Sequence, residues 1–217
     1  MKRLKISRKK WVIARRVGEY LSHIPTIEAI LVTGSLAMNN SDKFDDIDMM
    51  IITTPRTLWI TRIVIVLALK LKNLRRPPHI RTHSSKLVSD KICDNLYLDS
   101  DHLHITPTKF PDQNTFLAHE ILQAKPVLDK TGASAKFIKI NTWVKKYLPI
   151  AYAARLRLSK HPPVPKSPLW IYQTALTLTN LLAFCFQYLY MRPKITSEKI
   201  GLGFAYFHPL NNKQTPP

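Results

Sequence analysis

The stretch Val32-Thr33-Gly34-Ser35, followed after ten residues by Asp46-Ile47-Asp48-Met49-Met50-Ile51-Ile52, decides the fold expected for this chain. Residues 27–33 and 46–53 are both rich in Ile, Leu, Val or Met, a composition that favours buried β-strands. Between them lies Asn-Asn-Ser-Asp, which is typical of a loop. The sequence therefore predicts two consecutive strands joined by a glycine turn and a short polar connection.

The second strand opens with two carboxylates on one face. Side chains two residues apart in a strand point the same way, so Asp46 and Asp48 should lie together. Carboxylates held so close repel each other unless a cation lies between them, and hard oxygen ligands suit Mg²⁺. Gly34 allows the backbone to turn sharply and approach a ligand closely, and Ser35 adds a hydroxyl. These residues predict a site for a metal-bound triphosphate.

This arrangement resembles the nucleotidyltransferase superfamily, which includes DNA polymerase β, poly(A) polymerases and aminoglycoside nucleotidyltransferases. The shared signature is a hydrophobic residue, Gly-Ser or Gly-Gly, about ten residues, and then Asp-hydrophobic-Asp-hydrophobic. The resemblance implies that Gly34 and Ser35 contact the nucleotide phosphates. It also implies that Asp46 and Asp48 bind two Mg²⁺ ions, with Mn²⁺ as the alternative metal. A third carboxylate on a neighbouring strand would help to deprotonate the attacking hydroxyl.

The candidate for that third carboxylate lies on a predicted strand over 91–98. Simple alternation places Asp94 among apolar residues, where a carboxylate is unfavourable unless it is paired or bound to metal. Asp94 is therefore the leading third catalytic residue. If the apolar face packs on helices, however, the open face would carry Asn95 and Asp99 instead. Asn95 would depart from the acidic residue of the family and would weaken the case for transfer to a hydroxyl.

Most of the chain also resembles a group of prokaryotic nucleotidyltransferase-domain proteins of unknown substrate. The matching stretches are Arg56–Arg62, Ala118–Pro126, Asn141–Val144, Gln187–Met191 and Phe207–Pro209. This resemblance implies a helical C-terminal half that forms one wall of the active site. The wall residues it implies are His119, Glu120, Gln123 and Lys125.

The expected fold class is α/β (α+β): a small mixed nucleotidyltransferase sheet flanked by helices. Residues 1–110 would form the nucleotidyltransferase core, and residues 111–217 a helical C-terminal extension. A further short strand over 103–106 would form a hairpin with the strand at 91–98. Apolar periodicity and breaker residues predict the helices 8–22, 56–73, 113–124, 133–147 and 168–191.

Charge indicates a polyanionic partner. The chain carries 33 Lys and Arg against 14 Asp and Glu, a net charge of +19, and no acidic residue occurs from 130 to 197. Eight of the acids fall within the two windows 42–48 and 90–101. An acidic centre within a basic body suits a metal site with a nucleoside triphosphate, and RNA or another polyanionic acceptor. The same charge would suit anionic lipid.

Cysteine content and hydropathy bear on location. Cys93 and Cys185 are the two cysteines, with no Cys-x-x-Cys motif, which favours the reducing cytoplasm. The basic start of the chain lacks the apolar core of a signal peptide. Residues 169–191 carry no charge over 23 residues, but several Thr, Asn and Gln dilute the stretch. We expect a core helix there or a weak peripheral membrane contact.

These observations predict an Mg²⁺-dependent nucleotidyltransferase that moves a nucleoside monophosphate from a triphosphate such as ATP to an acceptor hydroxyl. The catalytic set would be Asp46, Asp48 and Asp94, with Gly34 and Ser35 on the phosphates. The alternative is a catalytically degenerate protein of the same fold that binds nucleotide or RNA. The sequence specifies neither the acceptor nor the oligomeric state.

Overall fold

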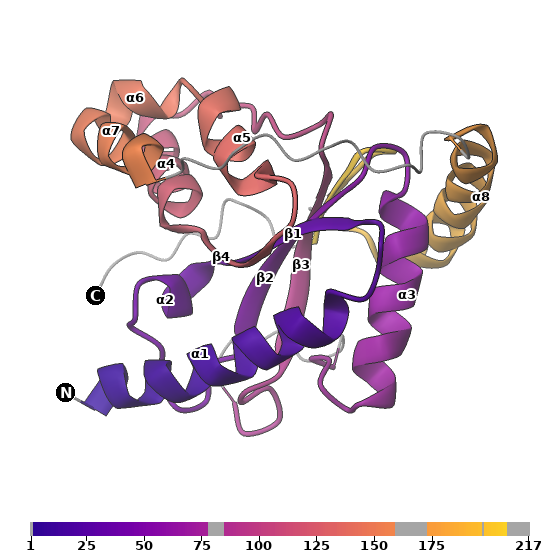
Figure 1. Cartoon of the computed structure of the whole chain (residues 1–217), viewed down its shortest axis with the longest axis horizontal. Helices are drawn as coiled ribbons and strands as arrows, with labels where there is room; N and C mark the ends of the chain where they lie inside the picture. The colour runs from indigo at the N-terminus through magenta and orange to yellow at the C-terminus, as the bar shows by residue number, and fades with distance from the viewer. Residues whose placement is uncertain (1, 78–84, 159–172, 197, 208–217) are drawn as a thin grey trace.

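In a computed structural model of the chain, a six-stranded sheet forms the centre of the molecule (Figure 1). The structure describes residues 2–77, 85–158, 173–196 and 198–207. The strand order is β4-β1-β2-β3-β6-β5; β2 and β3 are parallel, and every other neighbouring pair is antiparallel. The strands are β1 (Ile27–Val32), β2 (Ile47–Thr53), β3 (Ile92–Asp99), β4 (Lys125–Asp129), β5 (Lys199–Ile200) and β6 (Phe204–Tyr206).

Helices cover both faces of this sheet. One face packs against α1 (Lys2–Leu21) and α3 (Leu58–Leu71), and α8 (Gln173–Met191) lies outside α3 (Figure 1). The other face packs against a second group of helices: α4 (Pro111–Gln123), α5 (Ala133–Ile140), α6 (Val144–Tyr147) and α7 (Pro149–Leu158). The short α2 (Gly34–Ala37) directly follows β1, and a 3₁₀ turn (Arg192–Lys194) follows α8.

The pleat of the central strands divides the core into two clusters. Ile30 and Val32 of β1 pack on the α1 and α3 side, whereas Ala29 and Leu31 pack on the α4 to α7 side. Strands buried on both faces read as continuous apolar runs, which explains the composition of β1 and β2. Within β2, Asp48 near the start of the strand interrupts the apolar run on the face toward α4 to α7. The polar site is thus set into the edge of a hydrophobic layer.

The expected fold class, a mixed sheet flanked by helices, is confirmed. The first helix begins earlier than predicted, and the helix expected at 133–147 is divided into α5 and α6 by a turn. Residues 168–172 of the predicted last helix lie outside the described residues. The segment after residue 110 contributes more than helices, because β4 pairs with β1 and β6 pairs with β3. Both halves of the chain therefore build one sheet.

The predicted strand over 103–106 is wrong. The edge of β3 that it would occupy is taken by β6. The backbone of 103–106 bonds to side chains instead: the N–H of Ile105 donates to Asn141 Oδ1 at 2.8 Å, and Trp143 Nε1 donates to the carbonyl of Ile105 at 2.8 Å. These side chains provide hydrogen-bond partners for the buried N–H and C=O groups, which therefore do not need a neighbouring strand.

Among the helices of the described ranges, none combines the length and the apolar character that crossing a membrane requires.

Candidate functional site

The glycine turn and the start of β2 are in direct contact. Gly34 has φ +62°, in the left-handed region that favours glycine, and the N–H of Thr33 donates to the carbonyl of Asp48 at 3.0 Å. A Cβ added at Gly34 would lie 2.5 Å from Asp48 Oδ2. The predicted convergence of turn and carboxylate is therefore present in the structure.

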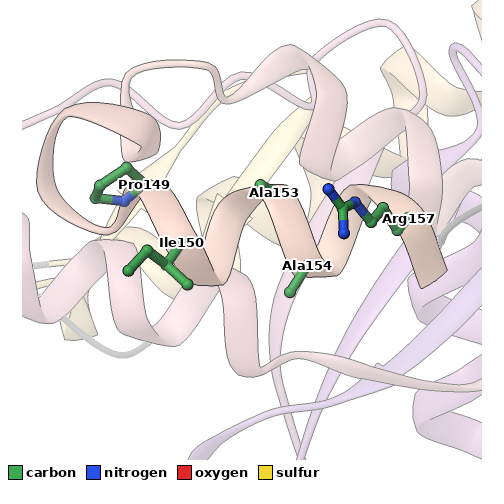
Figure 2. Close-up of a pocket in the computed structure, with 5 residues that line it drawn as sticks. All are labelled: Pro149, Ile150, Ala153, Ala154 and Arg157. Carbon is green, nitrogen blue, oxygen red and sulfur yellow. The ribbon is translucent and has the colours of Figure 1, made fainter.

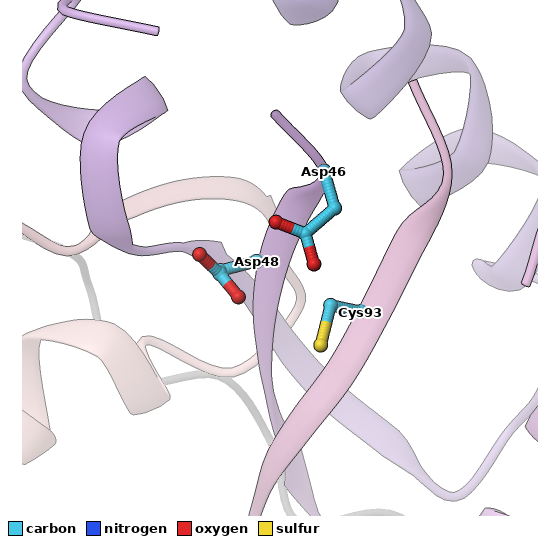
Figure 3. Close-up of side chains that lie close together, drawn as sticks. All are labelled: Asp46, Asp48 and Cys93. Atoms are coloured by element: carbon cyan, nitrogen blue, oxygen red, sulfur yellow. The ribbon is translucent and has the colours of Figure 1, made fainter. Parts of the chain in front are cut away.

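Asp46, directly before β2, and Asp48, within β2, point to the same face, as the pleat requires, and Cys93 of β3 lies beside them (Figure 3). One ligand atom from each of the three side chains falls within 4.8 Å of the other two. In the described part of the chain this is the one group of three or more His, Cys, Asp or Glu side chains that could hold a metal ion.

Two polar neighbours hold the acidic pair in place. Arg76, which follows α3, forms a buried ion pair with Asp46 (Nη1 to Oδ2, 2.5 Å) and also donates to the Cys93 sulfur at 3.6 Å. Asn95 Nδ2 donates to Asp48 Oδ1 at 2.8 Å. The charge of Asp46 is thus compensated by a guanidinium, whereas that of Asp48 is met by a neutral amide.

The pKa values reflect this difference in compensation. Burial, followed by the nearby charge of Asp46, raises the pKa of Asp48 to about 7. Burial also raises the pKa of the Cys93 thiol well above its usual range, so this sulfur stays protonated. A protonated thiol is a poor ligand for a hard cation. The metal-binding capacity of the cluster therefore comes from the two carboxylates.

A cleft of about 750 Å³ opens beside the pair. Among the described residues its lining includes four carboxylate side chains and no Lys or Arg; the carboxylates are those of Asp45, Asp46, Asp48 and Glu120. Its lining also includes apolar residues, among them Met50, Leu96 and Phe137. The cleft thus combines acidic and apolar side chains, in a protein of net charge +19.

The phosphate-binding candidates both line this cleft. Gly34 and Ser35 lie at its edge, and the Ser35 hydroxyl donates to Asp45 Oδ2 at 3.2 Å. Asp45 also accepts from the N–H of Asp42 at 2.7 Å, which closes the loop before β2. The Ser35 hydroxyl therefore has a carboxylate partner within the protein, and both Gly34 and Ser35 are lining residues of the cleft.

The third catalytic candidate needs correction: Asp94 does not join the pair. Its carboxylate accepts two hydrogen bonds from Arg75 (2.7 and 3.1 Å) and one from the Tyr97 hydroxyl (2.9 Å). The physical reason is a β-bulge in β3, where Met49 pairs with Asp94 but Met50 pairs with Leu96. The bulge leaves Asp94 facing α3 and turns the extra residue, Asn95, toward the cleft.

Asn95 therefore lies on the open face of β3 beside Asp48, as the alternative to Asp94 predicted. Asp99 lies at the far end of β3, where it accepts from His102 at 2.6 Å.

The next carboxylate across the cleft is that of Glu120 on α4. Its side chain is partly buried, and this burial raises its pKa to about 7. The charge of Glu120 also raises the pKa of Asp48, so the two groups face a common space.

Three of the four residues that the wider resemblance implies for the helical wall lie on the cleft. His119, Glu120 and Gln123 of α4 line the cleft. Lys125 is not among the lining residues; its ammonium lies 5.9 Å from the ring centre of Trp11. The pairing of Arg76 with Asp46 was not predicted, because residues 76 and 46 are far apart in the sequence and no local pattern links them.

The residues present fit one divalent cation. Asp46 and Asp48 supply hard oxygen ligands on one face, and burial together with the charge of Asp46 raises the pKa of Asp48, a shift that a bound cation would oppose. A second ion would need a third carboxylate beside the pair, and the described residues place an amide, that of Asn95, at this position. The donor set is thus smaller than the two-ion site that the sequence resemblance implies.

A second hollow lies on the surface of α7, lined by Pro149, Ile150, Ala153, Ala154 and Arg157 (Figure 2). Its described lining residues carry one charged group, Arg157, and among them there is neither a nucleophile nor a carboxylate.

Comparisons with protein-family models, with curated proteins and with solved structures give no match to this chain.

Proposed function

We propose that the main cleft binds a nucleoside triphosphate together with a divalent cation and transfers the nucleoside monophosphate to an acceptor hydroxyl. The observation that carries this proposal is the contact between the Gly34 turn and the Asp48 carboxylate, with Asp46 on the same face and in the same cleft. A phosphate chain at the turn would lie next to these carboxylates, which is favourable only with a cation between them.

The charge of the cleft makes the metal a requirement for nucleotide binding. Asp45, Asp48 and Glu120 line the cleft beside the Arg76-paired Asp46, and the described lining residues include no Lys or Arg, so a triphosphate would be repelled without a counter-ion. Asp46 and Asp48 would hold the ion, and the ion would neutralise the phosphate charge. The backbone of Gly34 and Ser35 would then position the phosphate chain at the edge of the cleft.

Glu120 is the group in the cleft best suited to accept the proton of the acceptor. Its pKa, raised to about 7 by burial, matches the range in which a general base works best. In this step the acceptor O–H loses its proton to the Glu120 carboxylate. Its oxygen forms the new bond to the α-phosphorus, and the bond from that phosphorus to the pyrophosphate oxygen breaks. Pyrophosphate leaves with the electron pair.

A second candidate function is nucleotide binding without transfer. Two observations favour it: Asn95 stands where the resemblance implies a carboxylate, and Arg76 already neutralises Asp46. Both features reduce the metal-binding capacity on which transfer depends. The two functions differ in one product, because pyrophosphate is released only by transfer.

The test measures nucleotide binding and pyrophosphate release in parallel. Purified protein, Mg²⁺ and labelled ATP, GTP, CTP or UTP are incubated with total RNA, protein and small-metabolite extracts. Transfer predicts pyrophosphate release and a labelled acceptor, both abolished by Asp48→Asn and strongly reduced by Glu120→Gln. Asp112→Asn, on the exposed first turn of α4, is the matched control and should retain activity. Binding without pyrophosphate release from any mixture would establish the second function instead.

A further inference from the structure

Helix α8 buries two polar side chains and exposes a row of large apolar ones. Asn180 and Gln187 face inward, beside the core-packed Phe184, and are buried at 4% and 7% exposure. Its outward side carries large apolar residues that are mostly more than half exposed; they are Leu178, Leu181, Leu182, Phe186, Leu189 and Tyr190. A helix that packs on a core in water normally shows the opposite arrangement.

The buried polar residues attach α8 to α3. Asn180 Oδ1 accepts from the N–H groups of Trp59 (2.8 Å) and Ile60 (3.4 Å). These N–H groups lie in the first turn of α3, where they have no partner within the helix. Gln187 accepts from Arg62 at 2.5 Å and donates to the carbonyl of Trp59 at 2.9 Å. These bonds fix the rotation of α8, so its apolar face points outward as a consequence of specific contacts.

This outward face is larger than ordinary surface exposure of single apolar residues. Leu182 is 70% exposed, Phe186 73% and Leu189 66%, and they recur at spacings of three and four residues along one side of the helix. A contiguous exposed apolar surface of this kind marks an interaction site, whereas single exposed apolar residues do not. In Figure 1, α8 is the outermost element on its side of the molecule, beyond α3.

The positive charge around α8 indicates which kind of partner binds its apolar face. Helices α3 and α8 lie in two stretches of the chain, 49–89 and 130–197, that contain no acidic residue. Lys70 and Lys72 at the end of α3 and Arg192 after α8 are exposed. A second copy docking through the same face would bring like charges together, which is unfavourable. A surface that is apolar within and anionic at its boundary complements this side of the protein.

We propose that the outer face of α8 docks on the surface of an anionic lipid bilayer. Leu178, Leu182, Phe186 and Leu189 would enter the boundary between head groups and acyl chains, while basic side chains contact the anionic head groups. The helix would lie along the surface and not cross the bilayer, in agreement with its buried polar side chains and with the absence of a membrane-spanning helix among the described residues. The main cleft lies on the other side of the sheet, so docking leaves it open.

The first test is co-sedimentation of the full chain with vesicles. We expect binding to phosphatidylcholine vesicles that contain phosphatidylglycerol, little binding to phosphatidylcholine alone, and weakening as salt is added. The double variant Leu182→Gln/Phe186→Gln should bind at least about tenfold more weakly, since each large apolar side chain contributes strongly to transfer from water. Ile150→Gln on α7, where the apolar side chain is 85% exposed on the opposite side of the molecule (Figures 1 and 2), is the control.

A second test uses the cysteines already present. Cys185 is exposed on α8 and Cys93 is buried, so a polarity-sensitive fluorophore will label Cys185 selectively. Its emission should shift to the blue when anionic vesicles are added, and quenchers on the lipid acyl chains should reduce it. Failure to bind anionic vesicles, or equal binding by the double variant, would overturn the proposal. So would a dimer in lipid-free solution that the double variant abolishes, because a second copy would then cover this face.

Discussion

Gly34 and Asp48 are packed so closely that a Cβ on Gly34 would lie 2.5 Å from the Asp48 carboxylate oxygen. The turn also has φ +62°, so both the space and the backbone conformation at this position demand glycine. This contact joins the two halves of the predicted site, because the turn that would hold phosphate touches the carboxylate that would hold the metal. Substitution at this position therefore tests the site directly.

Gly34→Ala should abolish nucleotide binding and destabilise the protein by about 1–2 kcal/mol. The new methyl group must displace the turn or the Asp48 carboxylate. The measurement is titration calorimetry with Mg²⁺ and ATP, beside urea unfolding.

Gly132→Ala is the matched control, since Gly132 also has a positive φ (+74°) but precedes α5 and does not line the cleft. It should lose similar stability and still bind nucleotide. Equal nucleotide binding by both variants would show that the Gly34 turn takes no part in the site.

Glu120 should make stability decrease as pH rises. Its pKa is 4.5 when unshifted and about 7 in the folded protein, so the folded state holds the extra proton between these values. The stabilisation is complete below pH 4.5 and is lost as the pH rises through 7. Because the side chain is partly buried, we expect Glu120→Gln to be more stable than wild type by about 2 kcal/mol at pH 8.

Urea unfolding at pH 5 and pH 8 checks this prediction. The advantage of Glu120→Gln should be near zero at pH 5 and appear at pH 8. A difference of the same size at both pH values would mean that the Glu120 carboxyl is not buried as the structure places it.

Strong local patterns predicted much of this molecule. The apolar runs at 27–33 and 46–53 became β1 and β2, and period-2 pleating correctly placed Asp46 and Asp48 on one face. The pattern failed at Asp94, because one extra residue in β3 reverses the side on which every preceding side chain lies. Apolar alternation alone carries no mark of such a bulge.

Contacts between residues far apart in the sequence were the other features that local patterns did not predict. β4 and β6 are short strands of five and three residues, and they exist because β1 and β3 offer free edges. The ion pair between Arg76 and Asp46 likewise depends on the return of the chain after α3. These features are properties of the assembled sheet, so a window of local sequence does not encode them.

Asn95→Asp should convert the pair into a stronger metal site. A carboxylate at this position would lie beside Asp48, which Asn95 contacts at 2.8 Å, and without metal the repulsion should destabilise the protein by about 1–3 kcal/mol. With three carboxylates, affinity for Mn²⁺ should rise at least about tenfold. Paramagnetic resonance of free Mn²⁺ measures this affinity. Asn73→Asp, on the exposed turn after α3, adds the same charge elsewhere and should leave Mn²⁺ binding unchanged.

Asp94→Asn should damage stability and leave the cleft unaffected. The substitution removes the partner of Arg75 in an ion pair whose carboxylate side chain is 3% exposed, and breaking a buried pair costs about 3 kcal/mol. Thermal unfolding should report the loss, while Mn²⁺ and nucleotide affinities stay at wild-type values. Loss of Mn²⁺ binding in a folded Asp94→Asn protein would return Asp94 to the metal site.

The most direct test of the metal-dependent cleft is the affinity for ATP of wild type and Asp48→Asn, each with and without Mg²⁺. Asparagine at 48 keeps the oxygen that accepts from Asn95 and removes only the charge that would hold the ion. We predict that wild type binds ATP only when Mg²⁺ is present, and that Asp48→Asn weakens this binding at least about tenfold, or ~1.4 kcal/mol. ATP binding that is equally strong without Mg²⁺, or equally strong in both proteins, would contradict the account.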